Sequence, residues 1–273
     1  MKILKFLYHM EIQFDKPVKE HHFTLKCIPH SGQGQLVESV SSQVYPNRYI
    51  SRSSDSFSNE CIYGYCGEEH DHFMVDVEGV VRTGMERIGG ECEEPPKSIF
   101  KYQTPHTLPG PQIEAYHKTI RKELESMIDR PGKGYVENMV LFYMHRLHQD
   151  FAYESGTTGI ETTAEKAFGQ GRGVCQDYTH ILLGLLRLEN IPSRYVTGMM
   201  EGEGLSHAWV EFYSENGWSA LDPTNDKRVT DEHISISRGR DYRDCRLNQG
   251  VFTGCNGKVG QHQTIRVEVK EIG

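Results

Sequence analysis

Apolar residues recur at helical spacing in the second half of the chain. Over residues 112–129 they fall at three- and four-residue steps, and a Pro-Gly pair follows shortly afterwards. The same spacing runs over residues 135–150. A third segment, 175–189, is apolar almost all round, which is typical of a helix buried inside its domain. The sequence therefore predicts three helices, of which the third is central.

Alternation of apolar and polar residues predicts strands at both ends of the chain. Within residues 1 to about 90 the clearest runs are 22–29 and 72–82, separated by serine-, glycine- and asparagine-rich segments that are typical of turns. After the central helix, strand patterns cover residues 194–198, 207–213, 218–222 and 264–269. We therefore expect a β-rich N-terminal part, followed by helices and then by an antiparallel sheet.

A proline-rich passage over residues 94–111 separates these parts. Proline lacks a backbone donor and favours extended chain, so this passage is the expected domain boundary. We predict an α+β protein with a β-rich domain over 1–100, a linker over 101–111 and a second domain over 112–273. The length of 273 residues accommodates two ordinary domains.

Composition narrows the expected environment and partners. The net charge of −8 and the lack of a basic run argue against nucleic acid or an anionic membrane as the main partner. The seven cysteines are odd in number and irregularly spaced, which does not indicate a disulfide framework. The first apolar run is interrupted by Lys5 and lacks a small-residue cleavage site, unlike a signal peptide. We expect a cytoplasmic protein with reduced thiols.

One cysteine lies where a thiol is expected to be reactive. Cys175 follows a Gly-x-Gly turn and opens the central helix, where unpaired backbone N–H groups favour the thiolate. His207 begins a predicted strand, and Asp222 ends the next strand, directly before a proline. A thiolate, a base and a group that orients the base are the components of cysteine-dependent acyl transfer.

Further residues are candidates for the surroundings of this site. Backbone N–H groups at the helix start are the expected oxyanion donors, with the Gln176 and Gln170 side chains as weaker candidates. Tyr153 and Trp209 are candidates for the cleft, although both are equally compatible with the core. Three consecutive residues are candidates for a substrate rim, or equally for a structural ion pair: Arg240, Asp241 and Tyr242.

The three motifs resemble a known family. G-V-C-Q-D-Y around Cys175, S-H-A-W-V-E around His207 and L-D-P-T-N around Asp222 are similar to the catalytic motifs of the transglutaminase-like superfamily. The chain also resembles bacterial members described as cysteine proteases, both over residues 233–244 and in its β-rich N-terminal domain. Where that domain has an Asp-x-x-Gly-Asn turn, this chain has D-S-F-S-N, with Ser58 in place of the glycine.

This resemblance implies a papain-like α+β fold in which the helix that carries the nucleophile packs on an antiparallel sheet. It also implies roles for three residues: Cys175 as nucleophile, His207 as general base and acid, and Asp222 as the group that orients the histidine. No dedicated cofactor is implied, and no acidic calcium-binding loop is recognisable in the sequence.

The register of one hairpin tests this assignment. Residues 216–217, an Asn-Gly pair, are a strong signal for a two-residue turn, and such a turn pairs Glu211 with Asp222. His207 then lies roughly 13 Å along the strand from the partner of Asp222. Direct pairing of His207 with Asp222 requires a turn centred on residues 214–215, or a bulge. We predict that shifted register, with the two side chains within about 4 Å of each other.

The expected activity is hydrolysis of a peptide or protein amide through a thioester on Cys175. Two alternatives remain: acyl transfer to an amine, as in a protein-glutamine transglutaminase, and a non-catalytic binding module of the same fold. A zinc site is a weaker alternative, because the C-x4-C spacing is unusual for zinc. Its ligands would be Cys61, Cys66, His70 and His72.

Overall fold

A long first strand organises the N-terminal half. The structure, a computed structural model, describes residues 1–32, 34–85, 97–127, 132, 134–254 and 257–273. Strand β1 (Lys2–Leu25) has 24 residues, and buried residues alternate with less buried ones along much of it, as in a strand with one covered face. Its first part pairs antiparallel with β5 (His70–Thr83) and β15 (Gln261–Glu271). Its last part pairs with β4 (Glu60–Cys66) and β14 (Asn248–Gly254).

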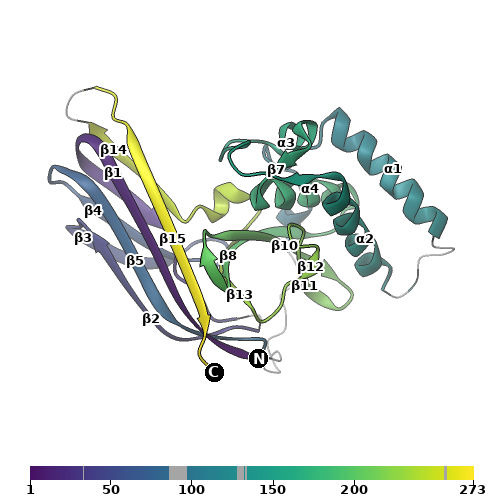
Figure 1. Ribbon diagram of the computed structural model, residues 1–273, viewed down its shortest axis with the longest axis horizontal. Helices are drawn as coiled ribbons and strands as arrows, with labels where there is room; N and C mark the ends of the chain where they lie inside the picture. The colour runs from purple at the N-terminus through teal and green to yellow at the C-terminus, as the bar shows by residue number, and fades with distance from the viewer. Residues whose placement is uncertain (33, 86–96, 128–131, 133, 255–256) are drawn as a thin grey trace.

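These strands belong to an eight-stranded sheet, which forms one side of the molecule (Figure 1). The strands β2 (Leu36–Tyr45), β3 (Tyr49–Ser54) and β9 (Gly202–Gly204) complete it.

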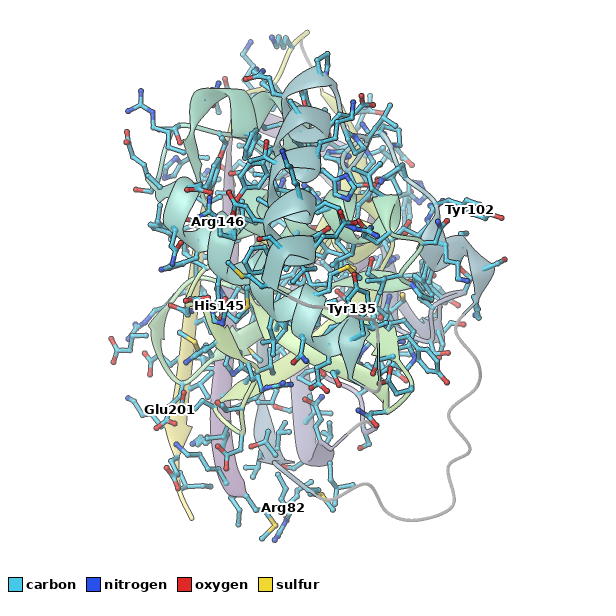
Figure 2. The ribbon with its side chains drawn as sticks, turned by 90° about the vertical axis from the view of Figure 1, so that its right-hand side faces the viewer. Arg82, Tyr102, Tyr135, His145, Arg146 and Glu201 are labelled. Carbon is cyan, nitrogen blue, oxygen red and sulfur yellow. The ribbon has the colours of Figure 1, made fainter. Side chains whose placement is uncertain are left out.

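The second half contains a five-stranded antiparallel sheet in the order β12–β11–β10–β8–β13. Helix α4 (Cys175–Leu188) packs against β10 (His207–Ser214) and β8 (Ser193–Met200). The other helices lie around α4, on the side away from the large sheet (Figure 1). Figure 2 views the molecule from this helical side, where α2 carries the labelled Tyr135, His145 and Arg146.

The remaining elements of this half are α1 (Pro111–Met127), α2 (Tyr135–Asp150), α3 (Ala164–Gln170), β6 (Ala152–Tyr153), β7 (Arg172–Gly173), β11 (Gly217–Asp222), β12 (Lys227–Arg228) and β13 (His233–Gly239), with 3₁₀ turns η1 (Ser98–Lys101) and η2 (Tyr242–Cys245). Within the described residues, no helix is both long enough and apolar enough to cross a membrane.

Two apolar cores hold these layers together. One lies between the helices and the five-stranded sheet and includes most of the apolar side chains of α4. The other covers the large sheet and also contains Met199, Ile234 and Ile236 from β8 and β13. Because the smaller sheet contributes to both cores, the two halves of the chain share apolar packing.

The predicted helices are confirmed, with α4 almost entirely buried and α2 at the predicted residues. The last two residues of the first predicted helix, 128–129, lie outside the described residues. The short helix α3 was missed. The predicted strand over 264–269 lies within β15, but its assignment to the second sheet is wrong, because β15 pairs with β1 over eleven residues. The C-terminal part of the predicted 112–273 domain therefore belongs to the large sheet.

The predicted linker over residues 101–111 packs against α4. His106 is 1% exposed, and the Thr107 hydroxyl accepts a hydrogen bond from Arg187 Nη1 at 2.9 Å. A Cβ on Gly184 of α4 would lie 2.7 Å from the Thr107 carbonyl oxygen, so glycine allows this close approach. The segment marks the change from strands to helices, but it is fixed in place.

A turn of the large sheet holds β13 of the smaller one. The buried Asn59 side chain donates to the Arg238 carbonyl and accepts from the Arg238 backbone N–H, both at 2.7 Å. Asp55 accepts from the backbone N–H groups of Phe57 and Asn59 at 2.8 and 3.0 Å. Ser58, between them, has φ +65°, the left-handed conformation that favours the glycine expected here.

Candidate active site

The start of α4 positions the Cys175 thiol. Cys175 is half-buried and is the first helical residue. The Asp177 carboxylate accepts from the backbone N–H of Val174 at 2.8 Å and from the Thr158 hydroxyl at 2.6 Å, which fixes the first turn. A Cβ on Gly173 would lie 2.4 Å from this carboxylate, so the second glycine of the Gly-x-Gly pair makes room for it.

The same turn offers backbone donors beside the thiol. The N–H groups of Asp177 and Tyr178 both donate to the Val174 carbonyl, at 2.9 and 3.2 Å. Those of Cys175 and Gln176 come at the very start of the helix, where no intrahelical acceptor exists. They are oriented along the helix axis at its positive end, as an oxyanion requires.

His207 lies between Cys175 and Asp222. It is the first residue of β10 and is mostly buried. Its Nε2 is 2.8 Å from Asp222 Oδ2. The ring also interacts with the Cys175 side chain, and this interaction favours its protonated form. Because Nε2 is bonded to the carboxylate, Nδ1 is the ring nitrogen left for sulfur.

Asp222 is fully buried and accepts several hydrogen bonds. The backbone N–H groups of Thr224 and Asn225 donate to its Oδ1 at 3.1 and 3.2 Å, and the Asn225 side chain donates to Oδ2 at 2.7 Å. His233 Nε2 is 3.4 Å from Oδ2. His233 Nδ1 accepts from the Thr230 backbone N–H at 3.3 Å, so the ring proton is on Nε2, facing the carboxylate.

These contacts strongly shift the pKa values of His207 and Asp222. Burial alone disfavours a charged His207, but its hydrogen bond to Asp222 and its interaction with the Cys175 side chain raise the pKa of His207 to about 10. Burial alone disfavours a charged Asp222, but hydrogen bonds from His207 and His233 hold the pKa of Asp222 well below its usual range. The geometry therefore favours an imidazolium that faces the thiol while the carboxylate stays ionised.

The hairpin register differs from both registers considered from the sequence. Ser214 pairs with Gly217, so the turn occupies residues 215–216. Gly217 has φ +86° while Asn216 has no positive φ, which excludes the Asn-Gly turn, because that turn needs positive φ at both residues. The predicted direct pairing of His207 with Asp222 is also wrong.

Continued by one residue, the observed ladder places Asp222 opposite Trp209. Trp209 and His207 are two residues apart on β10 and share a face of the strand. His207 therefore reaches Asp222 diagonally across the two strands. The observed separation of 2.8 Å lies within the expected limit of 4 Å.

The candidate cleft residues have different environments. Tyr153 is 60% exposed and pairs with Gly173 through β6 and β7, and burial together with the nearby Cys175 raises the pKa of Tyr153. Gln176 Nε2 donates weakly to the Ile160 carbonyl at 3.4 Å. Gln170 is exposed at the end of α3. Of these candidates, Tyr153 is the side chain with an electrostatic interaction with the thiol.

Trp209 lies behind the histidines. It is 1% exposed, with ring centroids 6.2 Å from His207 and 5.3 Å from His233. A Cβ on Gly198, the residue paired with His207, would lie 2.1 Å from the indole. Trp209 is thus a core residue that supports the two imidazoles.

The three candidate rim residues have different surroundings, and one of them, Tyr242, lines a cavity. The Arg240 guanidinium is paired with the Asp244 carboxylate at 2.7 Å. Asp241 is buried and accepts from the Arg243 backbone N–H at 2.8 Å, which caps η2. Tyr242 lines a cavity between the two halves of the chain.

Two residues beside Asp222 were missed from the sequence. Asn225 stands in the L-D-P-T-N motif, which was itself a signal. His233 lies in the segment that resembles the family after the aspartate, but no pattern in that segment distinguishes a buried donor.

The four residues considered as zinc ligands from the sequence lie in separate places or make other contacts. Cys61 and Cys66 are buried near opposite ends of β4. His70 lies 3.2 Å from His21, and His72 Nε2 lies 2.7 Å from Glu11. Among the described residues, the one group with metal-ligand spacing is His207, Asp222 and His233, whose nitrogen and oxygen atoms are already hydrogen-bonded to one another.

Comparison with known families identifies two regions. Residues 127–223 match the transglutaminase-like superfamily, and residues 4–82 match the bacterial transglutaminase-like N-terminal region. The first match includes Cys175, His207 and Asp222.

Two mycobacterial proteins are similar in sequence. An uncharacterized protein of Mycobacterium leprae is 41% identical over 112 residues, which cover 37% of this chain and 40% of that protein. Another, from Mycobacterium tuberculosis, is 26% identical over 226 residues, which cover 74% of this chain and 72% of that protein. The chain thus spans less than half the length of the first relative.

One solved structure covers the whole chain. A Cytophaga hutchinsonii protein described as a "putative cysteine protease" superposes with a TM-score of 0.76 at 20% identity, over 100% of this chain and 91% of that protein. Similarity at this identity concerns the fold. The expected α+β fold, a papain-type core with a β-rich N-terminal region, is confirmed.

Proposed function

The chain combines a transglutaminase-like core with a bacterial transglutaminase-like N-terminal region, and from this premise we propose that it is a cysteine-dependent amide hydrolase. Its substrate is a peptide or protein amide. Cys175 is the nucleophile, His207 the general acid and base, and Asp222 the group that orients His207.

One observation carries the proposal. The His207 ring bonds Asp222 at 2.8 Å through Nε2 and also interacts with the Cys175 side chain, which lies at the start of a helix. A buried histidine held between a carboxylate and a half-buried thiol is the arrangement that activates a sulfur nucleophile. The other four free cysteines among the described residues are all buried.

The first half of the reaction forms a thioester. The Cys175 thiolate attacks the amide carbonyl carbon, and a C–S bond forms as the carbonyl electron pair moves to oxygen. The backbone N–H groups of Cys175 and Gln176 donate to this oxyanion. The His207 imidazolium then gives its proton to the amide nitrogen, the C–N bond breaks, and the amine leaves.

The second half releases the acyl group. The now neutral His207 removes a proton from water, and the resulting hydroxide equivalent attacks the thioester carbon. The C–S bond breaks, a carboxylic acid is released, and the thiolate and imidazolium are restored. An amine in place of water gives a new amide instead, through the same steps. We favour water because it needs no dedicated acceptor site.

Thioester trapping tests the proposal. Denatured casein peptides are incubated with the protein, with and without added methylamine, and acid-quenched samples are examined by mass spectrometry. We expect an adduct on Cys175, new carboxyl termini and little amine incorporation. Cys175→Ala abolishes both products, whereas Cys61→Ala, which removes a buried thiol elsewhere, retains them. Turnover that survives in Cys175→Ala refutes the catalytic assignment, and dominant methylamine incorporation makes the protein an acyltransferase.

A further inference from the structure

A cavity lies between the large sheet and the catalytic half of the chain. Its volume is about 360 Å³, within the range of roughly 300–1,000 Å³ that is typical of ligand sites. Strands β1, β14 and β15 form one wall. The other wall comes from β8, η2 and the loops around residues 160 and 206.

The cavity reaches both catalytic elements. Ser206 lines it and directly precedes His207. Ile160 also lines it, and its carbonyl accepts the hydrogen bond from the side chain of Gln176, the residue after Cys175. The cavity is therefore lined by the residue that precedes His207 and by a residue hydrogen-bonded to the neighbour of Cys175.

Three residues that line the cavity each carry a buried polar atom with no hydrogen-bond partner within the described part of the chain: Tyr8 Oη, Arg246 Nε and Asn248 Oδ1. Tyr8 is 1% exposed, and burial raises the pKa of Tyr8 well above its usual value, so its hydroxyl stays protonated. Arg246 is held by Glu161, which accepts from its Nη2 at 2.6 Å. Buried polar groups of this kind are normally satisfied by a partner.

The three atoms together suit an amide. Arg246 Nε can only donate, Asn248 Oδ1 can only accept, and the Tyr8 hydroxyl can do either. A peptide unit offers its carbonyl oxygen to Arg246 Nε and its N–H to Asn248 Oδ1. An ionised carboxylate offers acceptors alone and places negative charge against Asn248 Oδ1.

The lining also includes an apolar part, beside polar side chains such as those of Gln249, Gln261 and Gln263. Phe14 and Phe252 meet edge to face at a centroid distance of 5.0 Å, with Ile12 and Ile265 beside them. Such a surface accommodates an apolar side chain next to the polar atoms.

We propose that this cavity is the peptide-binding subsite of the enzyme, taking an extended substrate segment with an apolar side chain against Phe14 and Phe252 and its backbone amide on Tyr8, Arg246 and Asn248. This assignment rests on the proposed function, because it names the substrate segment of the same site. It gives the large sheet, which supplies Tyr8 and the two phenylalanines, a direct part in substrate recognition.

Equilibrium binding to the full-length Cys175→Ala protein tests the subsite without turnover. The probe is a fluorescein-labelled tetrapeptide, acetylated and amidated at its ends, with Phe-Ala at its centre, and fluorescence anisotropy gives Kd. We expect saturable binding, and about three- to tenfold weaker binding for Tyr8→Phe, because that variant loses one neutral hydrogen bond. Tyr102→Phe is the matched control, since Tyr102 is 65% exposed and does not line the cavity.

Two further probes test the chemistry. Replacing the central Phe by Asp and methylating the central peptide nitrogen each weaken binding if the cavity holds an apolar side chain and an N–H donor. The subsite is refuted if the peptide does not bind, or if Tyr8→Phe and Tyr102→Phe bind equally well. Iodoacetamide labelling of Cys175 in the wild type is a separate readout: an unreactive thiol with intact peptide binding refutes the hydrolase and leaves a peptide-binding module.

Discussion

Replacing Asp222 by Asn should lower the pKa of His207 measurably. The substitution keeps the size of the side chain but removes the negative charge from a fully buried position, 2.8 Å from the imidazole. An amide oxygen at the Oδ1 position still accepts from the backbone N–H groups of Thr224 and Asn225, whereas the Asn225 side chain loses its acceptor at Oδ2. The change therefore acts chiefly on the electrostatic support of the imidazolium.

The expected magnitude follows from the pKa of His207. Its rise from an ordinary 6.5 to about 10 corresponds to about 5 kcal/mol in favour of the imidazolium, at about 1.4 kcal/mol per pKa unit. Asp222 and Cys175 both contribute to this rise. An equal share for Asp222 is about 2.5 kcal/mol, so the variant should titrate near pH 8.2, with about sixtyfold less imidazolium relative to neutral ring at alkaline pH.

Nuclear magnetic resonance of ¹³C-labelled histidine measures this directly. The His207 signal is assigned by its loss in His207→Gln, and its pKa is read from a titration between pH 5 and 11. Asp226→Asn is the matched control, because it makes the same change at an aspartate bonded to His145 on the surface. A wild-type pKa near 6.5, or equal pKa values in Asp222→Asn and Asp226→Asn, would refute the reasoning.

The pH dependence of stability has the corresponding sign. Because folding raises the pKa of His207, the protonated ring stabilises the folded state fully below about pH 6.5, and this contribution is lost as the pH rises through about 10. The difference in the free energy of unfolding between wild type and His207→Gln should therefore shrink from pH 7 to pH 10.

Three other substitutions have defined outcomes. Ser58→Gly should raise the free energy of unfolding by roughly 0.5 kcal/mol in urea titrations, because relief of the left-handed conformation outweighs the entropy of glycine in the unfolded chain; equal or lower stability contradicts this. Glu211→Gln should cost about 3–5 kcal/mol in the same assay, since it leaves a buried Arg238 without its charge partner; a loss below 1 kcal/mol contradicts this. His233→Phe should lower kcat about tenfold or more with KM unchanged, through loss of a donor to Asp222; a change in KM alone assigns His233 to binding.

The helices could be predicted from the sequence because their signal is local. The apolar stripe over residues 135–150 and the apolar run of α4 each follow from spacing within a few turns. The position of Cys175 at the start of α4 follows in the same way from the two glycines before it. Local patterns contain the information that these elements need.

Strand partners could not be predicted, because pairing depends on residues far apart in the chain. β15 has a clear strand pattern, yet nothing in that pattern indicates β1, more than two hundred residues earlier, as its partner. β13 was missed for another reason: its polar residues are all buried. Their partners, such as Gln35 for Ser235 and Glu211 for Arg238, lie in other elements.

The hairpin between β10 and β11 shows how a correct pair of catalytic residues can follow from an incorrect register. Direct cross-strand pairing is one way for His207 to meet Asp222, and it was the one considered from the sequence. The actual ladder uses Gly217 to end the turn and places Trp209 opposite the aspartate, so the histidine approaches along the diagonal. In this arrangement Trp209 lies behind the imidazole and His233 lies beside the carboxylate. The register that departs from the simplest pairing is therefore also the one that brings a second histidine to Asp222.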